Sequence, residues 1–149
     1  MIAMPVSTHP VDPTPTILVV AGILRRQGRV LAVRRPPGKP LAGYWEFPGG
    51  KVETGETPGA ALERELEEEL GIRPKEYAFW QAKSHSYAHA RVHIHFFRIS
   101  VAEGEPVARE GQHIAWISPA RAGELNFLEA DADVVNDLIA EETPCASQT

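Results

Sequence analysis

The alternation of apolar and polar residues predicts a β-hairpin near the start of the chain. Residues 16–24 are β-branched and apolar throughout, which is typical of a strand that is covered on both faces. A Gln-Gly pair then turns the chain into a second strand at residues 29–35. Residues 36–44 contain three prolines and two glycines, so they predict a loop over a site, followed by a short strand at 45–47.

The second half of the chain continues with strands and ends in a helix. Residues 76–87, 90–101 and 113–117 predict strands, and apolar residues at helical spacing predict a helix over 130–140. In the strand at 90–101 an apolar set that should face the core alternates with a polar set that should face a surface or cleft: Val92, Ile94 and Phe96 against Arg91, His93 and His95. Strands and helices interleave without repeats, which predicts an α/β fold with helices on both faces of a mixed sheet.

The best-defined helix is predicted at residues 58–70. Thr57 suits the N-cap, Pro58 suits the first helical position, and Gly71 can adopt the left-handed conformation that ends a helix. An apolar stripe at spacings of four should face the core: Leu62, Leu66 and Leu70.

Three carboxylates lie beside that apolar stripe. At about 100° per residue, Glu68 and Glu69 fall within about 60° of Glu65, and Arg64 lies one turn before Glu68. Like charges at this spacing destabilise a helix by about 0.2–0.5 kcal/mol per pair, so a bound cation would relieve the repulsion. Clustered carboxylate oxygens suit Mg²⁺ or Mn²⁺, and the alternative is an ordinary solvated acidic face.

Composition limits the class of protein. The 149 residues, 43% of them apolar, fit one domain at residues 16–140, with a flexible arm at 1–15 and a flexible tail at 141–149. The net charge of −5 argues against binding to nucleic acid. The chain has a single cysteine, Cys145, and no apolar run long enough to span a membrane, so we expect a cytoplasmic protein that is a monomer or a homodimer.

The acidic helix lies within a longer motif of fixed spacing. Its specified positions are Gly50, Glu56, Arg64, Glu65, Leu66, Glu68, Glu69, Gly71 and Ile72. This spacing resembles, without a gap, the box that defines the Nudix hydrolases. Further segments resemble the MutT branch of that family: Trp45-Glu46-Phe47-Pro48, Glu110-Gly111-Gln112 and Glu129-Ala130-Asp131. The resemblance implies an α/β/α sandwich and an enzyme that removes pyrophosphate from nucleoside triphosphates, including oxidised ones.

The resemblance also implies a divalent metal site. Glu65, Glu68 and Glu69 would bind Mg²⁺ or Mn²⁺, with the Gly50 carbonyl and the loop residue Glu110 as further ligands. Glu65, Glu68 and Arg64 would form the catalytic set, with Glu65 as the candidate base. Glu56 is expected to be structural and to bond the backbone around the box.

Four residues are candidates for binding the nucleotide. By resemblance, Arg35 would contact the nucleotide, and Phe47 and Asp131 would hold and read the base. Arg91 is added because it shares a strand face with the predicted cleft-lining residues. Without the resemblance, Phe47 would be a core residue, Asp131 a helix cap and Arg35 a solvated arginine. As an ionised carboxylate, Asp131 would accept a hydrogen bond from the N7–H of an 8-oxopurine or from the amino group of cytosine.

The segment from His85 to His95 contains four histidines, which leave open whether the protein binds a second metal ion. They would either line the cleft or bind zinc, although no cysteine pair supports a zinc site.

The leading hypothesis is a Mg²⁺-dependent nucleoside triphosphate diphosphatase that sanitises the nucleotide pool. The alternatives are a Nudix hydrolase for a nucleotide sugar, ADP-ribose or a dinucleoside polyphosphate, and a catalytically inactive domain that binds nucleotides.

Overall fold

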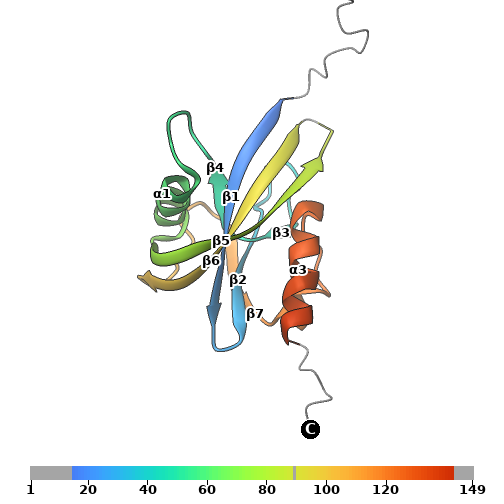
Figure 1. The fold of residues 1–149 in the computed structure, drawn as a ribbon. Helices are drawn as coiled ribbons and strands as arrows, with labels where there is room; N and C mark the ends of the chain where they lie inside the picture. Colours follow the sequence, from blue (N-terminus) through green and yellow to red (C-terminus); the bar gives the residue numbers. More distant parts are fainter. Residues whose placement is uncertain (1–14, 89, 143–149) are drawn as a thin grey trace, which may run out of the picture.

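A single mixed sheet forms the centre of the molecule, and its helices lie on opposite sides (Figure 1). The structure is a computed structural model that describes residues 15–88 and 90–142. In this part of the chain the elements are β1 (Thr16–Arg26), β2 (Arg29–Arg34), β3 (Trp45–Glu46), β4 (Gly49–Lys51), α1 (Pro58–Leu70), β5 (Arg73–Ser86), β6 (Arg91–Glu103), β7 (His113–Ile117), α2 (Pro119–Ala122) and α3 (Glu129–Glu142).

Strand β1 is central to the sheet. It runs parallel to β6 from Thr16 to Leu24, and it pairs antiparallel with both β2 and β4. The predicted hairpin is present, and its turn residues Gln27 and Gly28 have φ values of 53° and 78°, as the tight turns of hairpins require. Strand β2 soon leaves β1 and pairs with β3 and β7, so the main strand order is β3-β2-β1-β6-β5.

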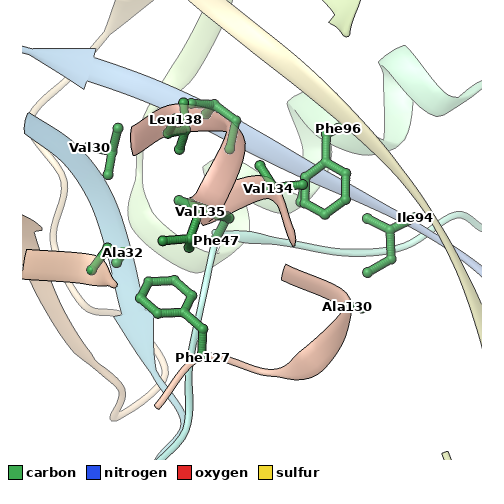
Figure 2. Close-up of a cluster of buried hydrophobic side chains, with 13 residues drawn as sticks. Val30, Ala32, Phe47, Ile94, Phe96, Phe127, Ala130, Val134, Val135 and Leu138 are labelled. Carbon is green, nitrogen blue, oxygen red and sulfur yellow. The ribbon is translucent and has the colours of Figure 1, made fainter. Parts of the chain in front are cut away.

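Two apolar cores lie on opposite faces of the sheet. On one face the predicted stripe of α1 packs against Val20, Leu24 and Phe97, and Leu62, Leu66 and Leu70 have no exposed surface. On the other face α3 packs against β1 and β6, as Figure 2 shows for Val134, Val135, Leu138 and Phe96. The predicted α/β/α sandwich with a mixed sheet is therefore confirmed.

Helix α1 has the predicted bounds because its ends are determined locally. The Thr57 hydroxyl accepts a hydrogen bond from the Ala60 N–H at 3.1 Å, and Pro58 occupies the first turn. Gly71 has a φ of 72°, and its N–H bonds the Glu67 carbonyl at 2.9 Å. The Cβ of any other residue would disfavour this left-handed cap.

Other predicted boundaries need correction. Helix α3 continues to Glu142, where the expected tail had begun at residue 141, because Glu141 pairs with Arg25 and Arg98. Strand β4 was not predicted at all. Most of the expected arm and tail, at residues 1–14 and 143–149, lies outside the described residues, as does Cys145. No helix among the described residues is long and apolar enough to cross a membrane.

Candidate active site

A cleft of about 660 Å³ opens beside α1 and β4. Its lining includes many of the residues singled out from the sequence: Arg35, Phe47, Gly50, Glu65, Glu69, Glu110 and Asp131. The same cleft is lined by Lys39, Glu46 and Gln112, to which the sequence assigned no role. The fold therefore brings together residues of five strands, of the helices α1 and α3, and of the loops between them around one cavity.

The two glycines of β4 allow the backbone to lie against β1 and α1. A Cβ on Gly49 would lie 1.9 Å from the Val20 carbonyl oxygen, and a Cβ on Gly50 would lie 2.3 Å from the Glu65 carboxylate. Neither position can hold a larger residue without a shift of its neighbours. The Glu65 side chain thus lies directly against the backbone that was expected to supply the Gly50 carbonyl ligand.

Arg64 ties the carboxylates of the motif to one another. Its guanidinium donates two hydrogen bonds to Glu56, at 2.7 and 2.9 Å, and one to Glu65 at 2.9 Å. It also reaches Glu68 at 3.3 Å and the Lys51 carbonyl at 3.0 Å. The bidentate bond from Arg64 lowers the pKa of Glu56 to about 2.

Glu56 also accepts a hydrogen bond from the Glu53 N–H at 3.0 Å. The expectation that Glu56 is structural and bonds the backbone around the motif is therefore confirmed. Together with Arg64 it joins the loop before α1 to the helix itself.

Glu69 is an acidic group in surroundings that disfavour its charge. One carboxylate oxygen, Oε1, is buried and has no hydrogen-bond partner among the described residues. Burial, followed by repulsion from Glu46, Glu110 and Glu65, raises the pKa of Glu69 to about 8. Burial is also the largest cause of the raised pKa of Glu65.

These groups fit a divalent cation. A buried carboxylate oxygen without a partner would gain a ligand bond, and repulsion among neighbouring carboxylates would be relieved by positive charge. As they stand in the described part of the chain, however, no three acidic or histidine side chains surround one point where an ion could bind.

Glu68 and Glu110 lie in different surroundings from Glu65 and Glu69. Glu68 is not among the cleft-lining residues; its side chain is 57% exposed and bonds Arg64. Glu110 lines the cleft from the loop between β6 and β7, and its charge acts on both Glu65 and Glu69.

Cationic residues line the same cleft as the acidic helix. Arg35 donates hydrogen bonds to Glu46 at 3.0 Å and to the Pro40 carbonyl at 2.7 Å. These bonds attach the loop over residues 36–44 to the end of β2. Lys39 lines the cleft from this loop, and its charge acts on both Glu46 and Glu69.

Asp131 is almost fully buried at the first turn of α3, with 3% of its surface exposed. Its Oδ2 accepts a hydrogen bond from the Phe47 N–H at 2.8 Å. Burial and the nearby Glu46 raise the pKa of Asp131 to about 8, which favours a neutral carboxyl group where an ionised one was expected. In its neutral form the group both donates and accepts hydrogen bonds.

Phe47 belongs chiefly to the core below the cleft. It is 3% exposed, and its ring packs edge-on against Phe96 and at a tilt against Phe127 (Figure 2). It also borders the cleft, where its backbone N–H binds Asp131.

The structure does not bring Arg91 into this cleft. Val92 and Ile94 of β6 line the cleft, so the alternating residues Arg91 and His93 point to the opposite face of the sheet. The cleft therefore lies on the apolar side of β6, which corrects the expectation that the polar set would face it. Arg91 lines a second hollow of about 510 Å³.

The described histidines of this segment, His85, His93 and His95, do not line the main cleft either. His85 bonds Glu129 at 2.9 Å, and His93 bonds the Ser84 hydroxyl at 2.7 Å. His89 lies outside the described residues. The described residues contain no cluster suited to zinc.

Fold, motif and cleft together define the class of protein. The chain belongs to the NUDIX domain family, whose family model matches residues 13–138. The resemblance identified from the motif is thereby confirmed.

Individual members of the family are similar to this chain over most of its length. The chain is 36% identical over 126 residues to the 8-oxo-dGTP diphosphatase of Haemophilus influenzae, with 84% of this chain and 93% of that protein covered. It is also 36% identical over 124 residues to the CTP pyrophosphohydrolase of Escherichia coli, with coverages of 83% and 92%. The solution structure of the E. coli ORF135 protein has a TM-score of 0.77 to this structure at 33% identity, covering 92% of this chain and 99% of that one.

Proposed function

We propose that this protein is a Mg²⁺- or Mn²⁺-dependent nucleoside triphosphate diphosphatase that converts normal and oxidised deoxynucleoside triphosphates to monophosphates and pyrophosphate. The observation that carries the proposal is one cleft that holds an acidic cluster, basic side chains that include Arg35 and Lys39, and a buried base-reading candidate. Within the acidic cluster, one Glu69 oxygen has no hydrogen-bond partner among the described residues. The similarity to an 8-oxo-dGTP diphosphatase and to a CTP pyrophosphohydrolase supports the same activity.

Glu65, Glu69 and Glu110, with Glu68 and the Gly50 carbonyl, are the residues that would hold the metal. The ion would supply positive charge that offsets the charge developing on the phosphate oxygens. Arg35 and Lys39 provide further positive charge along the cleft, where the polyphosphate would lie.

Glu65 is the candidate base that takes a proton from the attacking water. Its carboxylate borders the cleft, and Arg64 holds one of its oxygens at 2.9 Å. Arg64 would therefore act as a positioning residue, since it joins Glu65 and Glu68 to Glu56 in the loop before α1.

Asp131 is the candidate that selects the base. A neutral carboxyl group in the cleft can donate to a carbonyl oxygen and accept from an N–H or amino group. An 8-oxopurine and a cytosine each offer both kinds of partner. We therefore assign the enzyme a range that includes cytosine-type triphosphates as well as 8-oxo-dGTP.

The test is a Mg²⁺-dependent assay of pyrophosphate release on 8-oxo-dGTP, dGTP, dCTP and CTP, with ADP-ribose as the substrate of a competing Nudix activity. Release of pyrophosphate and monophosphate from 8-oxo-dGTP and dCTP is expected, together with its loss in Glu65→Gln. Preferential turnover of ADP-ribose, or equal rates in EDTA, would refute the proposal.

A further inference from the structure

The loop between β6 and β7, residues 104–112, lies on the C-terminal end of α1. The last four carbonyls of a helix have no partner within the helix, and this loop supplies donors to them. The Val107 N–H bonds the Leu70 carbonyl at 2.9 Å, and the Arg109 N–H bonds the Glu69 carbonyl at 3.1 Å. The Arg109 guanidinium adds a bond to the Glu67 carbonyl at 2.9 Å.

The side chain of Gln112 makes the most specific of these contacts. Its Nε2 donates to the Glu69 carbonyl at 3.2 Å, and its Oε1 accepts from the Glu110 N–H at 2.8 Å. One planar amide thus joins the backbones of two residues whose carboxylates both line the cleft. A side-chain amide can donate and accept in this way, whereas an ionised carboxylate at the same place would lack the donor.

This link opposes a force that acts within the site. Glu110 repels Glu65 and Glu69, and the Glu110 residue is exposed on a loop that could move away from them. Hydrogen bonds to the end of α1 hold the loop in place against that repulsion.

From this geometry we propose that Gln112 is a positioning residue that holds Glu110 beside Glu69, so that both carboxylates meet one divalent ion. The inference rests on the metal-dependent function proposed above. Gln112 itself need not touch the ion or the nucleotide.

The first test measures Mn²⁺ affinity of the nucleotide-free protein by titration calorimetry. Groups that orient metal ligands typically contribute about 10–100-fold to metal affinity or activity. Gln112→Leu, which removes both hydrogen bonds at similar size, should weaken Mn²⁺ binding about tenfold. Gln81→Leu is the matched control, because Gln81 bonds Asp137 of α3 at 2.9 Å and is not among the residues that line the cleft.

A double-mutant comparison shows whether Gln112 acts through Glu110. If it does, the Gln112→Leu, Glu110→Gln double variant binds Mn²⁺ no more weakly than Glu110→Gln alone. At saturating Mg²⁺, Gln112→Leu should lower kcat about tenfold and change the KM for nucleotide little. The proposal would be overturned if the losses of Mn²⁺ affinity from the two substitutions multiplied in the double variant. Wild-type Mn²⁺ affinity in a folded Gln112→Leu protein would overturn it as well.

Hydrogen exchange on the wild-type protein gives a test that needs no variant. The Glu110 amide should exchange more slowly than an open loop amide even without metal, because Gln112 accepts its hydrogen. Exchange at the rate of a free amide would refute the inference even if every variant fails to fold. A wild-type protein that binds Mn²⁺ but hydrolyses no nucleotide would refute the proposed function instead, and the Mn²⁺ comparison would still test Gln112.

Discussion

Replacing Asp131 by Asn should make the protein more stable, and the gain should grow as pH rises. In the folded state burial raises the pKa of Asp131 from its ordinary value of 3.8 to about 8. Between these two values the folded protein keeps a proton that the unfolded chain has lost. Wild-type stability therefore falls as pH increases, by at most about 1.4 kcal/mol per pH unit from this group.

The structure allows the magnitude to be worked out. Asn keeps an oxygen that accepts from the Phe47 N–H, and its amide hydrogens replace the hydroxyl of the neutral acid. The two proteins should therefore have similar stability only below pH 3.8, where Asp131 is protonated in both the folded and the unfolded state. Between pH 5.5 and pH 7.5 the stability advantage of the Asn variant should grow by about 2–3 kcal/mol, because the variant has no proton to lose.

Urea unfolding of both proteins across this pH range is the assay. With a slope of about 1–3 kcal/mol per molar urea, the difference between the two midpoints should widen by about 1–2 M. Other titrating groups are common to both proteins and cancel in the comparison. Asp133→Asn, at an exposed position of the same helix, controls for the chemical change. Midpoints that stay parallel from pH 5.5 to 7.5 would show that Asp131 is ionised in the folded protein.

Three further predictions concern the acidic site. Glu68→Gln should lower kcat by about two orders of magnitude or more, yet leave the metal-free melting temperature no lower, because an exposed pair with Arg64 contributes only about 0.3–0.5 kcal/mol; a clear drop on thermal scanning would make Glu68 structural. Glu110→Gln should reduce kcat more than it raises KM, since it completes the site from a loop, and unchanged turnover at saturating Mg²⁺ would contradict this. Gly50→Ala should reduce kcat/KM about 100-fold while circular dichroism stays unchanged, because the new methyl group displaces the Glu65 carboxylate; near-normal activity would show that Glu65 tolerates the shift.

Local sequence determined the bounds of α1 and the nature of its acidic face. Thr57, Pro58 and Gly71 each act within one turn of the helix end, so their effect can be read without knowledge of distant residues. The same holds for the hairpin turn between β1 and β2, whose Gln-Gly pair adopts positive φ. The motif likewise identified the family from sequence alone, because it is defined by residue types at fixed spacing along the chain and not by contacts in the folded protein.

Only the tertiary structure decided which side chains share the cleft. Strand β4 has no alternating pattern, since Gly49 and Gly50 have no side chains, and it forms because β1 offers backbone partners far away in sequence. Arg91 appeared to share a face with the cleft, but which face of β6 borders the cleft depends on where α1 and α3 pack.

The raised pKa of Asp131 and the role proposed for Gln112 likewise could not be predicted from the sequence. Burial of Asp131 depends on packing between α3 and Phe47, which lies 84 positions earlier in the chain. Gln112 acquires its two partners only when its loop meets the end of α1. Desolvation and hydrogen bonding of this kind depend on distances between remote segments, whereas helix ends and turns depend on neighbours in the chain.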